Sequence, residues 1–86
     1  MHYLYILKSD IQDWHYIGIA EDVAARLRKH NSGSVRLTKA YRPLQVVHTE
    51  VFRDKTSARK RELFLKKTAR ARKELFTQVE APSSSG

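Results

Sequence analysis

Glu62 is the residue whose position is hardest to explain by ordinary surface chemistry. It is an acid inside the most basic segment of the chain. It follows Ala58 by four residues and precedes Leu65 by three, which places it on the side of a predicted helix that packs inward. A neighbouring arginine is the usual partner of such a carboxylate. A divalent cation is the alternative, because hard carboxylate oxygens suit Mg²⁺ when water and phosphate supply the other ligands.

Three further residues that could take part in chemistry precede Glu62 in the chain: a phenol, an arginine and a histidine. Arg26 and His30 are four residues apart, so they project from the same face of a predicted helix. Taken alone, they read as an ordinary polar helix face. Tyr16 comes shortly before that helix, and Gly18 at the end of its strand is expected to permit a turn that leaves the phenol beside the helix.

The positive charge of the chain is concentrated in one segment. The net charge is +8. Residues 53–73 hold ten Lys or Arg and two acids, whereas residues 1–52 hold seven and five. Solvated helices usually intersperse acids among bases, so this segment favours binding to a phosphate backbone, with an anionic membrane as the alternative. The predicted nucleic-acid contacts are Lys39, Arg42, Arg59, Lys66, Lys67, Arg70 and Lys73.

Length and composition restrict the class of protein. With 86 residues the chain has room for one domain. The absence of cysteine excludes a disulfide scaffold and a thiolate metal site. No apolar run approaches the roughly 20 residues that span a bilayer, so the sequence predicts a cytoplasmic protein without membrane segments.

The first half of the chain predicts two strands, a helix and a third strand. Residues 2–7 and 14–19 are rich in aromatic and aliphatic side chains and read as an antiparallel hairpin. An acidic first turn and a cationic last turn mark a helix over residues 22–30. Residues 34–42 are polar and aperiodic and read as a loop, and residues 44–52 predict a strand that completes a three-stranded sheet.

The second half predicts two helices. Asp54 or Ser57 caps the first, whose buried side is assigned to Ala58, Leu65 and the Leu63-Phe64 pair. The second spans residues 69–79. The sequence therefore predicts an α/β (α+β) domain over residues 1–79, a three-stranded antiparallel sheet flanked by about three helices. Residues 80–86 are small and polar, and we expect a disordered tail there.

The ordered set of motifs resembles a GIY-YIG nuclease domain. The set consists of Tyr3-Leu4-Tyr5, Tyr16-Ile17-Gly18, Arg26, His30 and Glu62. The resemblance covers nearly the whole chain, from Tyr3 to about Phe76. The segments 30–33 and 38–43 further resemble the small stand-alone bacterial members of the family, the UPF0213-like proteins.

The resemblance implies a role for each of five positions. Tyr16 would act as, or orient, the general base that deprotonates an attacking water, and Tyr5 would hold that water or the phosphate. Glu62 would anchor one Mg²⁺ or Mn²⁺ ion, and Arg26 would stabilise charge on the phosphoryl oxygens. His30 could share the base role, and at neutral pH a histidine is the more natural base than a phenol. The choice between Tyr16 and His30 stays open.

The implied function is a metal-dependent endonuclease of DNA rather than RNA, structure-selective or weakly sequence-specific, that leaves a 5′-phosphate and a 3′-hydroxyl. Such an activity would serve DNA repair or recombination. Ile19 stands where repair-nuclease relatives have a Lys, and Asn31, the only Asn, leaves no counterpart to a late Asn near the metal; Arg70 or Lys73 is the candidate substitute. These departures motivate the alternative, a catalytically weak or inactive nucleic-acid-binding domain that uses residues 53–73. A third reading is an interaction with an acidic protein.

Overall fold

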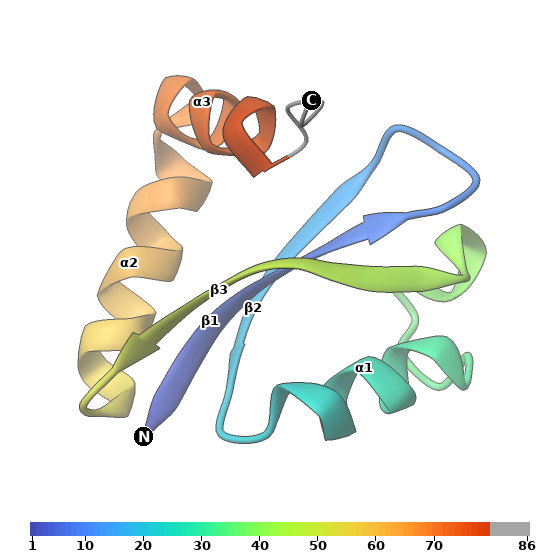
Figure 1. The fold of residues 1–86 in the computed structure, drawn as a ribbon, viewed down its shortest axis with the longest axis horizontal. Coiled ribbons are helices and arrows are strands. Elements are labelled where there is room, and N and C mark those ends of the chain that lie inside the picture. The colour runs from blue at the N-terminus through green and yellow to red at the C-terminus, as the bar shows by residue number, and fades with distance from the viewer. Residues whose placement is uncertain (80–86) are drawn as a thin grey trace, which may run out of the picture.

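The apolar opening of the chain forms the central strand of a three-stranded antiparallel sheet. In the computed structural model, which describes residues 1–79, strand β1 (His2–Ser9) lies between β2 (His15–Ala20) and β3 (Leu44–Phe52) (Figure 1). β1 pairs with β2 as a hairpin, as its sequence predicted. The predicted fold class is confirmed.

A buried serine closes the hairpin. The Ser9 hydroxyl accepts hydrogen bonds from the backbone N–H groups of Ile11 and Gln12, at 3.1 and 3.2 Å. It donates to the Tyr41 carbonyl at 2.7 Å. One side chain therefore satisfies the turn and ties it to the segment before β3.

The first two helices begin at aspartate caps. Asp22 accepts from the N–H of Ala25 at 3.0 Å and starts α1 (Val23–Asn31). Asp54, not Ser57, caps α2 (Lys55–Lys67) in the same way, at 2.8 Å from the N–H of Ser57. The expected acidic first turn of α1 is wrong, because Asp22 stands at the cap and no acid follows it there.

The remaining elements complete the order of the chain. After α1 the backbone turns at Gly33, whose φ of 86° is left-handed. A short 3₁₀ helix, η1 (Lys39–Tyr41), lies inside the segment predicted as a loop. α3 (Ala69–Val79) has the predicted bounds and packs against the end of α2.

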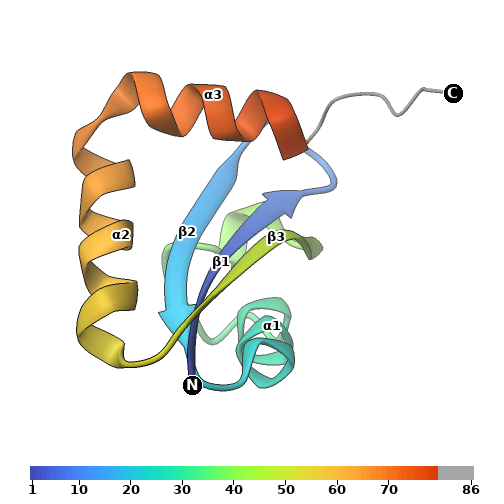
Figure 2. The same ribbon diagram turned by 60° about the vertical axis from the view of Figure 1, so that its left-hand side comes forward.

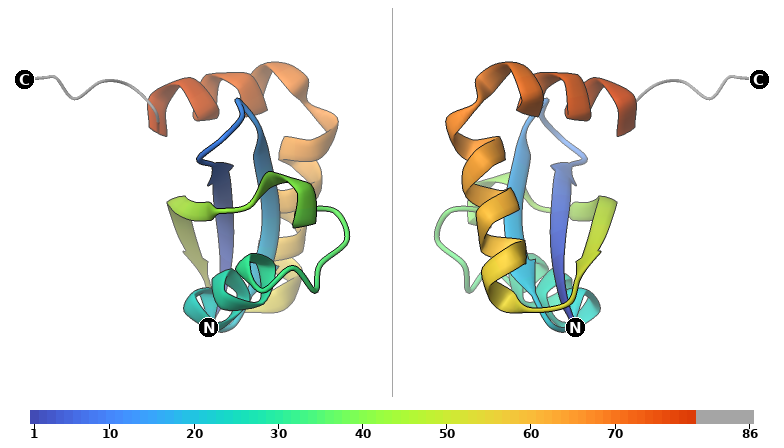
Figure 3. Two further views of the ribbon diagram at one scale, coloured as in Figure 1. Left: turned by 90° about the vertical axis from the view of Figure 1, so that its right-hand side faces the viewer. Right: turned by 90° about the vertical axis from the view of Figure 1, so that its left-hand side faces the viewer.

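The sheet has a different cover on each face. α2 and α3 lie on one face and α1 on the other (Figures 2 and 3). Alternate side chains of β1 serve the two sides, as strand geometry requires. Leu4 and Ile6 pack toward Leu65 of α2, whereas Tyr5 and Leu7 pack toward α1 and η1.

The buried side of α2 differs from the one predicted. Leu63 and Phe64 are 42% and 48% exposed, so assigning that pair to the core was wrong. Ala58, Glu62 and Leu65 are buried instead, because residues spaced by four and three lie on one helix face while 63 and 64 lie around the side. The inward position predicted for Glu62 is confirmed.

The expected disordered tail, residues 80–86, lies outside the described residues. Among residues 1–79, no helix has the length and apolar character needed to cross a bilayer.

Candidate active site

A cavity of about 300 Å³ opens at the free edge of β2, where the two faces of the sheet meet. β2 contributes side chains to both faces, α1 approaches from one side and α2 from the other. The lining residues are Tyr16, Gly18, Ile19, Arg26, Lys55, Arg59 and Glu62. The structure thus brings together three of the five predicted catalytic residues, Tyr16, Arg26 and Glu62, from three separate elements.

Glu62 supplies the only carboxylate of the cavity lining, and the residue is 7% exposed. Its Oε2 accepts a hydrogen bond from Lys66 Nζ at 3.0 Å. Its Oε1 lies 3.8 Å from Arg59 Nη1 and is buried without a hydrogen-bond partner. The ion pair expected for a helix glutamate is therefore present, yet one oxygen is left with acceptor capacity.

Arg26 is the cation that α1 contributes to the cavity. Its interaction with Tyr5 raises the pKa of the guanidinium above the usual value, so it stays charged at any physiological pH. Its Nε is buried without a hydrogen-bond partner. One side chain therefore reaches Tyr5 and retains a donor for a further group.

Tyr5 and His30 lie behind the cavity instead of lining it. Tyr5 is fully buried, and its hydroxyl lies 3.0 Å from His30 Nε2. His30 is 1% exposed, and its Nδ1 lies 2.9 Å from Thr38 Oγ1. The His30 and Tyr16 rings are 4.8 Å apart between centroids, so the pair supports Tyr16 from the inside.

Burial keeps both inner groups neutral. It raises the pKa of Tyr5 above its usual value, against the opposing influence of Arg26. It lowers the pKa of His30, and the charges of Arg26 and Lys29 lower it further. A buried imidazole beside two cations therefore holds its proton less tightly than a solvent-exposed one.

Gly18 is required by a close contact and not by a turn. It lies inside β2, opposite Tyr5 in the register, and its φ is not positive. A Cβ at this position would meet Tyr5 Oη at 2.6 Å and Tyr16 Cε2 at 3.0 Å. The predicted turn is wrong. The missing side chain instead lets the Tyr5 phenol lie across the strand, beside Tyr16.

The predicted nucleic-acid contacts fall in separate regions. Arg59 lines the cavity and Lys66 pairs with its carboxylate, while Lys67 is exposed on the last turn of α2. Lys39 and Arg42 are exposed at η1, on the α1 side of the sheet (Figure 1).

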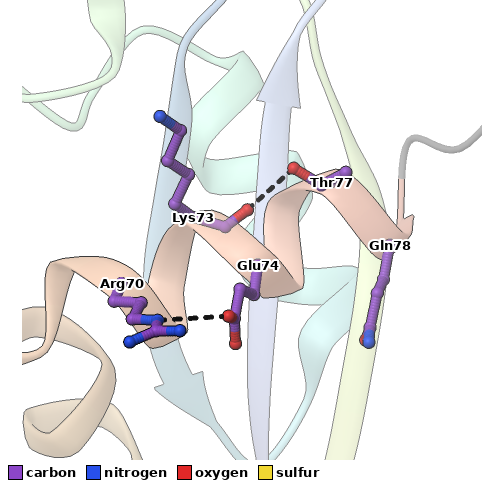
Figure 4. Close-up of a pocket in the computed structure, with 5 residues that line it drawn as sticks. All are labelled: Arg70, Lys73, Glu74, Thr77 and Gln78. Carbon is purple, nitrogen blue, oxygen red and sulfur yellow. Dashed lines mark hydrogen bonds and ion pairs between the residues drawn. The ribbon is translucent and has the colours of Figure 1, made fainter.

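The last two predicted contacts, Arg70 and Lys73, belong to α3. They border a second hollow of about 530 Å³. Figure 4 shows Arg70 directed toward Glu74, with Arg70 Nε 3.5 Å from Glu74 Oε2. Lys73 extends away from that pair. The seven cations therefore do not form one continuous patch around the cavity.

Two residues of the site were not predicted from the sequence. Lys55 lines the cavity, and its spacing of four and seven from Arg59 and Glu62 could have placed it on the same face of α2. Thr38, fully buried against His30, lies in the segment 38–43 that resembles the small members of the family, but its aperiodic surroundings gave no spacing that would pair it with His30. Asn31 serves the fold, because its side chain pairs with both the N–H and the carbonyl of Leu44, at 2.8 and 2.9 Å.

The residues around Glu62 fit a weakly held divalent ion. Within residues 1–79 no cluster of three or more His, Cys, Asp or Glu side chains could enclose a metal. Mg²⁺ often takes only one or two carboxylates and completes its shell with water and substrate phosphate. The unpaired Oε1 of Glu62 offers one such ligand in a cavity that leaves room for the others.

Comparison with known proteins identifies the family of the chain. Residues 1–75 match the family described as the GIY-YIG catalytic domain. A UPF0213 protein of Staphylococcus saprophyticus is 44% identical over 62 residues, which cover 71% of this chain and 74% of that protein. A UPF0213 protein of Staphylococcus aureus is 42% identical with the same coverage.

A solved structure has a similar fold. The solution NMR structure of the UPF0213 protein BH0048 from Bacillus halodurans is 31% identical in sequence. It aligns with a TM-score of 0.56 over 95% of this chain and 87% of that one. The resemblance drawn from the sequence motifs is confirmed.

Proposed function

Since this chain belongs to the GIY-YIG catalytic domain family, we propose that it is an endonuclease that hydrolyses a nucleic-acid phosphodiester with the help of a divalent metal ion. One observation carries the proposal. The residues lining the cavity include a buried carboxylate oxygen and a buried guanidinium nitrogen, neither of which has a hydrogen-bond partner. Such an oxygen suits a cation and such a nitrogen suits a phosphate oxygen, so a metal-bound phosphodiester satisfies both.

Tyr16 is the residue assigned to the attacking water. It lines the cavity, whereas His30 is almost fully buried and uses both ring nitrogens on Tyr5 and Thr38. A general base must reach the proton that it removes. The position of Tyr16 therefore favours it over His30 as the group that orients the water and accepts its proton. The ring of Tyr16 lies 6.0 Å from the Lys66 ammonium, which adds a nearby positive charge.

Cations on both sides of the cavity are assigned to the phosphate. Arg26 approaches from α1, and Lys55 and Arg59 approach from α2. Charge that develops on the phosphoryl oxygens during attack is stabilised by donors already fixed in place. Lys55 and Arg59 can also neutralise the charge of a neighbouring phosphate on the same strand.

Glu62 is the residue that would hold the Mg²⁺ or Mn²⁺ ion, whose charge stabilises the departing 3′ oxygen when bound. With water attacking phosphorus and the 3′ oxygen leaving, the products are a 5′-phosphate and a 3′-hydroxyl. Oε1 is the oxygen that would hold the ion, and Lys66 can keep its hydrogen bond to Oε2 and so fix the carboxylate.

Tyr5 and His30 are assigned to positioning. Their hydroxyl–imidazole contact holds Tyr5 against Gly18 and leaves its oxygen beside Arg26. The pair thereby fixes the orientation of Arg26 and supports the Tyr16 ring. This assignment replaces direct contact of Tyr5 with the water or phosphate, since Tyr5 is fully buried.

DNA is the proposed substrate, with recognition of its structure instead of its sequence. The charge of segment 53–73 serves backbone contacts, which carry no sequence information. The bacterial origin of the relatives fits action on DNA in the cytoplasm, in repair or recombination.

The test is cleavage of labelled single-stranded, branched and duplex DNA with Mg²⁺ or Mn²⁺, followed by end-group analysis. Glu62→Gln is expected to lower kcat by roughly 10²- to 10³-fold, the usual loss when one electrostatic stabiliser is removed. Glu74→Gln is the matched control, because it also loses an ion pair within a helix but lies on exposed α3. Cleavage undiminished by Glu62→Gln would refute the assignment.

A second candidate is a nucleic-acid-binding domain with little or no catalysis. Two features favour it: the cavity lining offers a single carboxylate, and most of the net charge lies in segment 53–73. It predicts metal-independent, salt-sensitive binding without cleavage of any substrate. Charge reversal at four positions is expected to weaken that binding; they are Lys66, Lys67, Arg70 and Lys73. Unchanged affinity would exclude this candidate.

A further inference from the structure

A line of buried hydrogen bonds runs from behind the cavity to Thr38, a residue to which the proposed reaction gives no role. Tyr5 Oη lies 3.0 Å from His30 Nε2, and His30 Nδ1 lies 2.9 Å from Thr38 Oγ1. The Thr38 hydroxyl donates in turn to the Val35 carbonyl at 3.4 Å. Tyr5, His30 and Thr38 are each at most 1% exposed, so bulk solvent does not reach these contacts.

The direction of each hydrogen bond can be followed from the Val35 end. The Thr38 hydroxyl donates its single proton to the Val35 carbonyl at 3.4 Å, and that carbonyl also accepts from the backbone N–H groups of Thr38 and Lys39 at 3.2 and 3.0 Å. The Thr38 oxygen is then left to accept from His30, which places a proton on Nδ1. Burial lowers the pKa of His30, so the imidazole carries one proton and its Nε2 must accept. The Tyr5 hydroxyl is therefore the donor to Nε2.

A Tyr5 hydroxyl that donates to His30 is also compatible with Arg26, the other polar neighbour of Tyr5. Arg26 has donors and no acceptor, and its guanidinium interacts with the Tyr5 oxygen. A Tyr5 hydroxyl that donates to His30 keeps its lone pairs for Arg26. If Nε2 carried the proton instead, Tyr5 would face two donors and its own proton would have no acceptor in this buried contact.

We infer that Thr38 is a positioning residue of the active site: its hydroxyl fixes the proton of His30 on Nδ1, and through Tyr5 it orients Arg26 at the cavity. The effect on catalysis rests on the proposed function, whereas the effect on the His30 tautomer does not. Thr38 occupies the N-cap of η1, yet its side chain makes no cap hydrogen bond. Its hydroxyl is thus engaged with His30 and the Val35 carbonyl and not with the helix it precedes.

The first experiment determines the tautomer in the full-length protein without any substrate. Long-range ¹H–¹⁵N correlation spectra of ¹⁵N-histidine-labelled protein at pH 7 report which ring nitrogen carries the proton. The expected result for His30 is a protonated Nδ1 and an unprotonated Nε2. A proton on Nε2, or an imidazolium at this pH, overturns the inference whatever the nuclease assay shows.

The second experiment removes the hydroxyl. Thr38→Val keeps the branched shape and is expected to give a mixed or reversed His30 tautomer and a kcat lower by about 10-fold or more, with KM changed little, because a misplaced catalytic group slows the chemical step. Thr38→Ser retains the hydroxyl and is expected to retain the tautomer and most of the rate. Thr77→Val is the matched control, since its hydroxyl also bonds a backbone carbonyl but on the exposed side of α3.

The outcomes separate this inference from the proposed function. If no variant and no wild-type sample cleaves DNA, the proposed function fails while the tautomer result still decides the role of Thr38. A Thr38→Val protein with the wild-type tautomer and rate overturns the inference. If Thr38→Val does not fold, the spectra of the wild type and of Thr38→Ser decide alone, and different tautomers in those two proteins overturn it.

Discussion

The two sides of the Tyr16 ring are built in opposite ways. On the inner side Tyr5, His30 and Thr38 are buried and every polar side-chain atom has a partner. On the cavity side Glu62 and Arg26 each keep a buried polar atom without a hydrogen bond. A buried polar atom left unpaired costs free energy, so its presence beside an open cavity is informative. The inner side holds the geometry fixed and the outer side is left ready for a ligand.

The largest expected effect comes from removing one phenol hydroxyl on each side of the comparison. Tyr16→Phe is expected to lower kcat by about 10²- to 10³-fold with little change in stability, because its hydroxyl is assigned to the attacking water. Tyr5→Phe is expected to lower the free energy of unfolding by about 1–3 kcal/mol, because it leaves the buried Nε2 of His30 without its donor. Single-turnover cleavage and urea unfolding measure the two quantities. Equal losses of stability in both variants would show that the comparison is wrong.

A smaller effect, on stability, is expected where the buried Tyr5 ring contacts the backbone of Gly18. Gly18→Ala is expected to destabilise the protein by about 1–3 kcal/mol, since the new methyl would lie 2.6 Å from Tyr5 Oη and 2.7 Å from Tyr5 Cζ. The same change in a Tyr5→Phe background is expected to cost less, because the nearest atom is gone. A double-mutant cycle by urea unfolding measures the coupling. If the two substitutions lowered the free energy of unfolding additively, the absence of a side chain at Gly18 would not be explained by the Tyr5 phenol.

The smallest effect is a dependence of stability on pH. The pKa of His30 is lowered in the folded state by burial and by the charges of Arg26 and Lys29, so the unfolded chain binds a proton that the folded chain refuses. The contribution of His30 to stability is therefore complete above the ordinary histidine pKa of about 6.5 and decreases as the pH falls below it. Urea unfolding from pH 7.5 to 5 is expected to show a steeper loss in the wild type than in His30→Gln. A parallel course would contradict the assignment of a neutral His30.

Much of the fold was predictable because the patterns that specify it are local. The β-rich runs, the helical spacing of apolar residues and the Asp54 cap located the strands and helices to within a few residues, and α3 has its predicted bounds. The errors arose where two patterns overlap. Leu63 and Phe64 are apolar, but the three- and four-residue spacing that reaches the core belongs to Ala58, Glu62 and Leu65.

The site was predictable to the extent that motif and spacing carry it. Tyr16, Arg26 and Glu62 are in fact neighbours around one cavity. The catalytic roles of these residues and of Tyr5 and His30 stay predictions until the variants above are measured. The motif does not reveal which of its residues are buried. It includes Tyr5 and His30 with the others, although both lie behind the cavity.

The sequence by itself determined the strands, the helices and the family of this protein, since side-chain periodicity, caps and motif spacing are properties of neighbouring residues. Only the tertiary structure decided which polar groups are paired and which are left open. Lys55 reaches the cavity because α2 lies beside the edge of β2. Thr38 reaches His30 because the segment before η1 packs against α1. Partners so far apart in the chain are chosen by packing, and burial then sets the protonation of His30 and the contacts left unmade at Glu62.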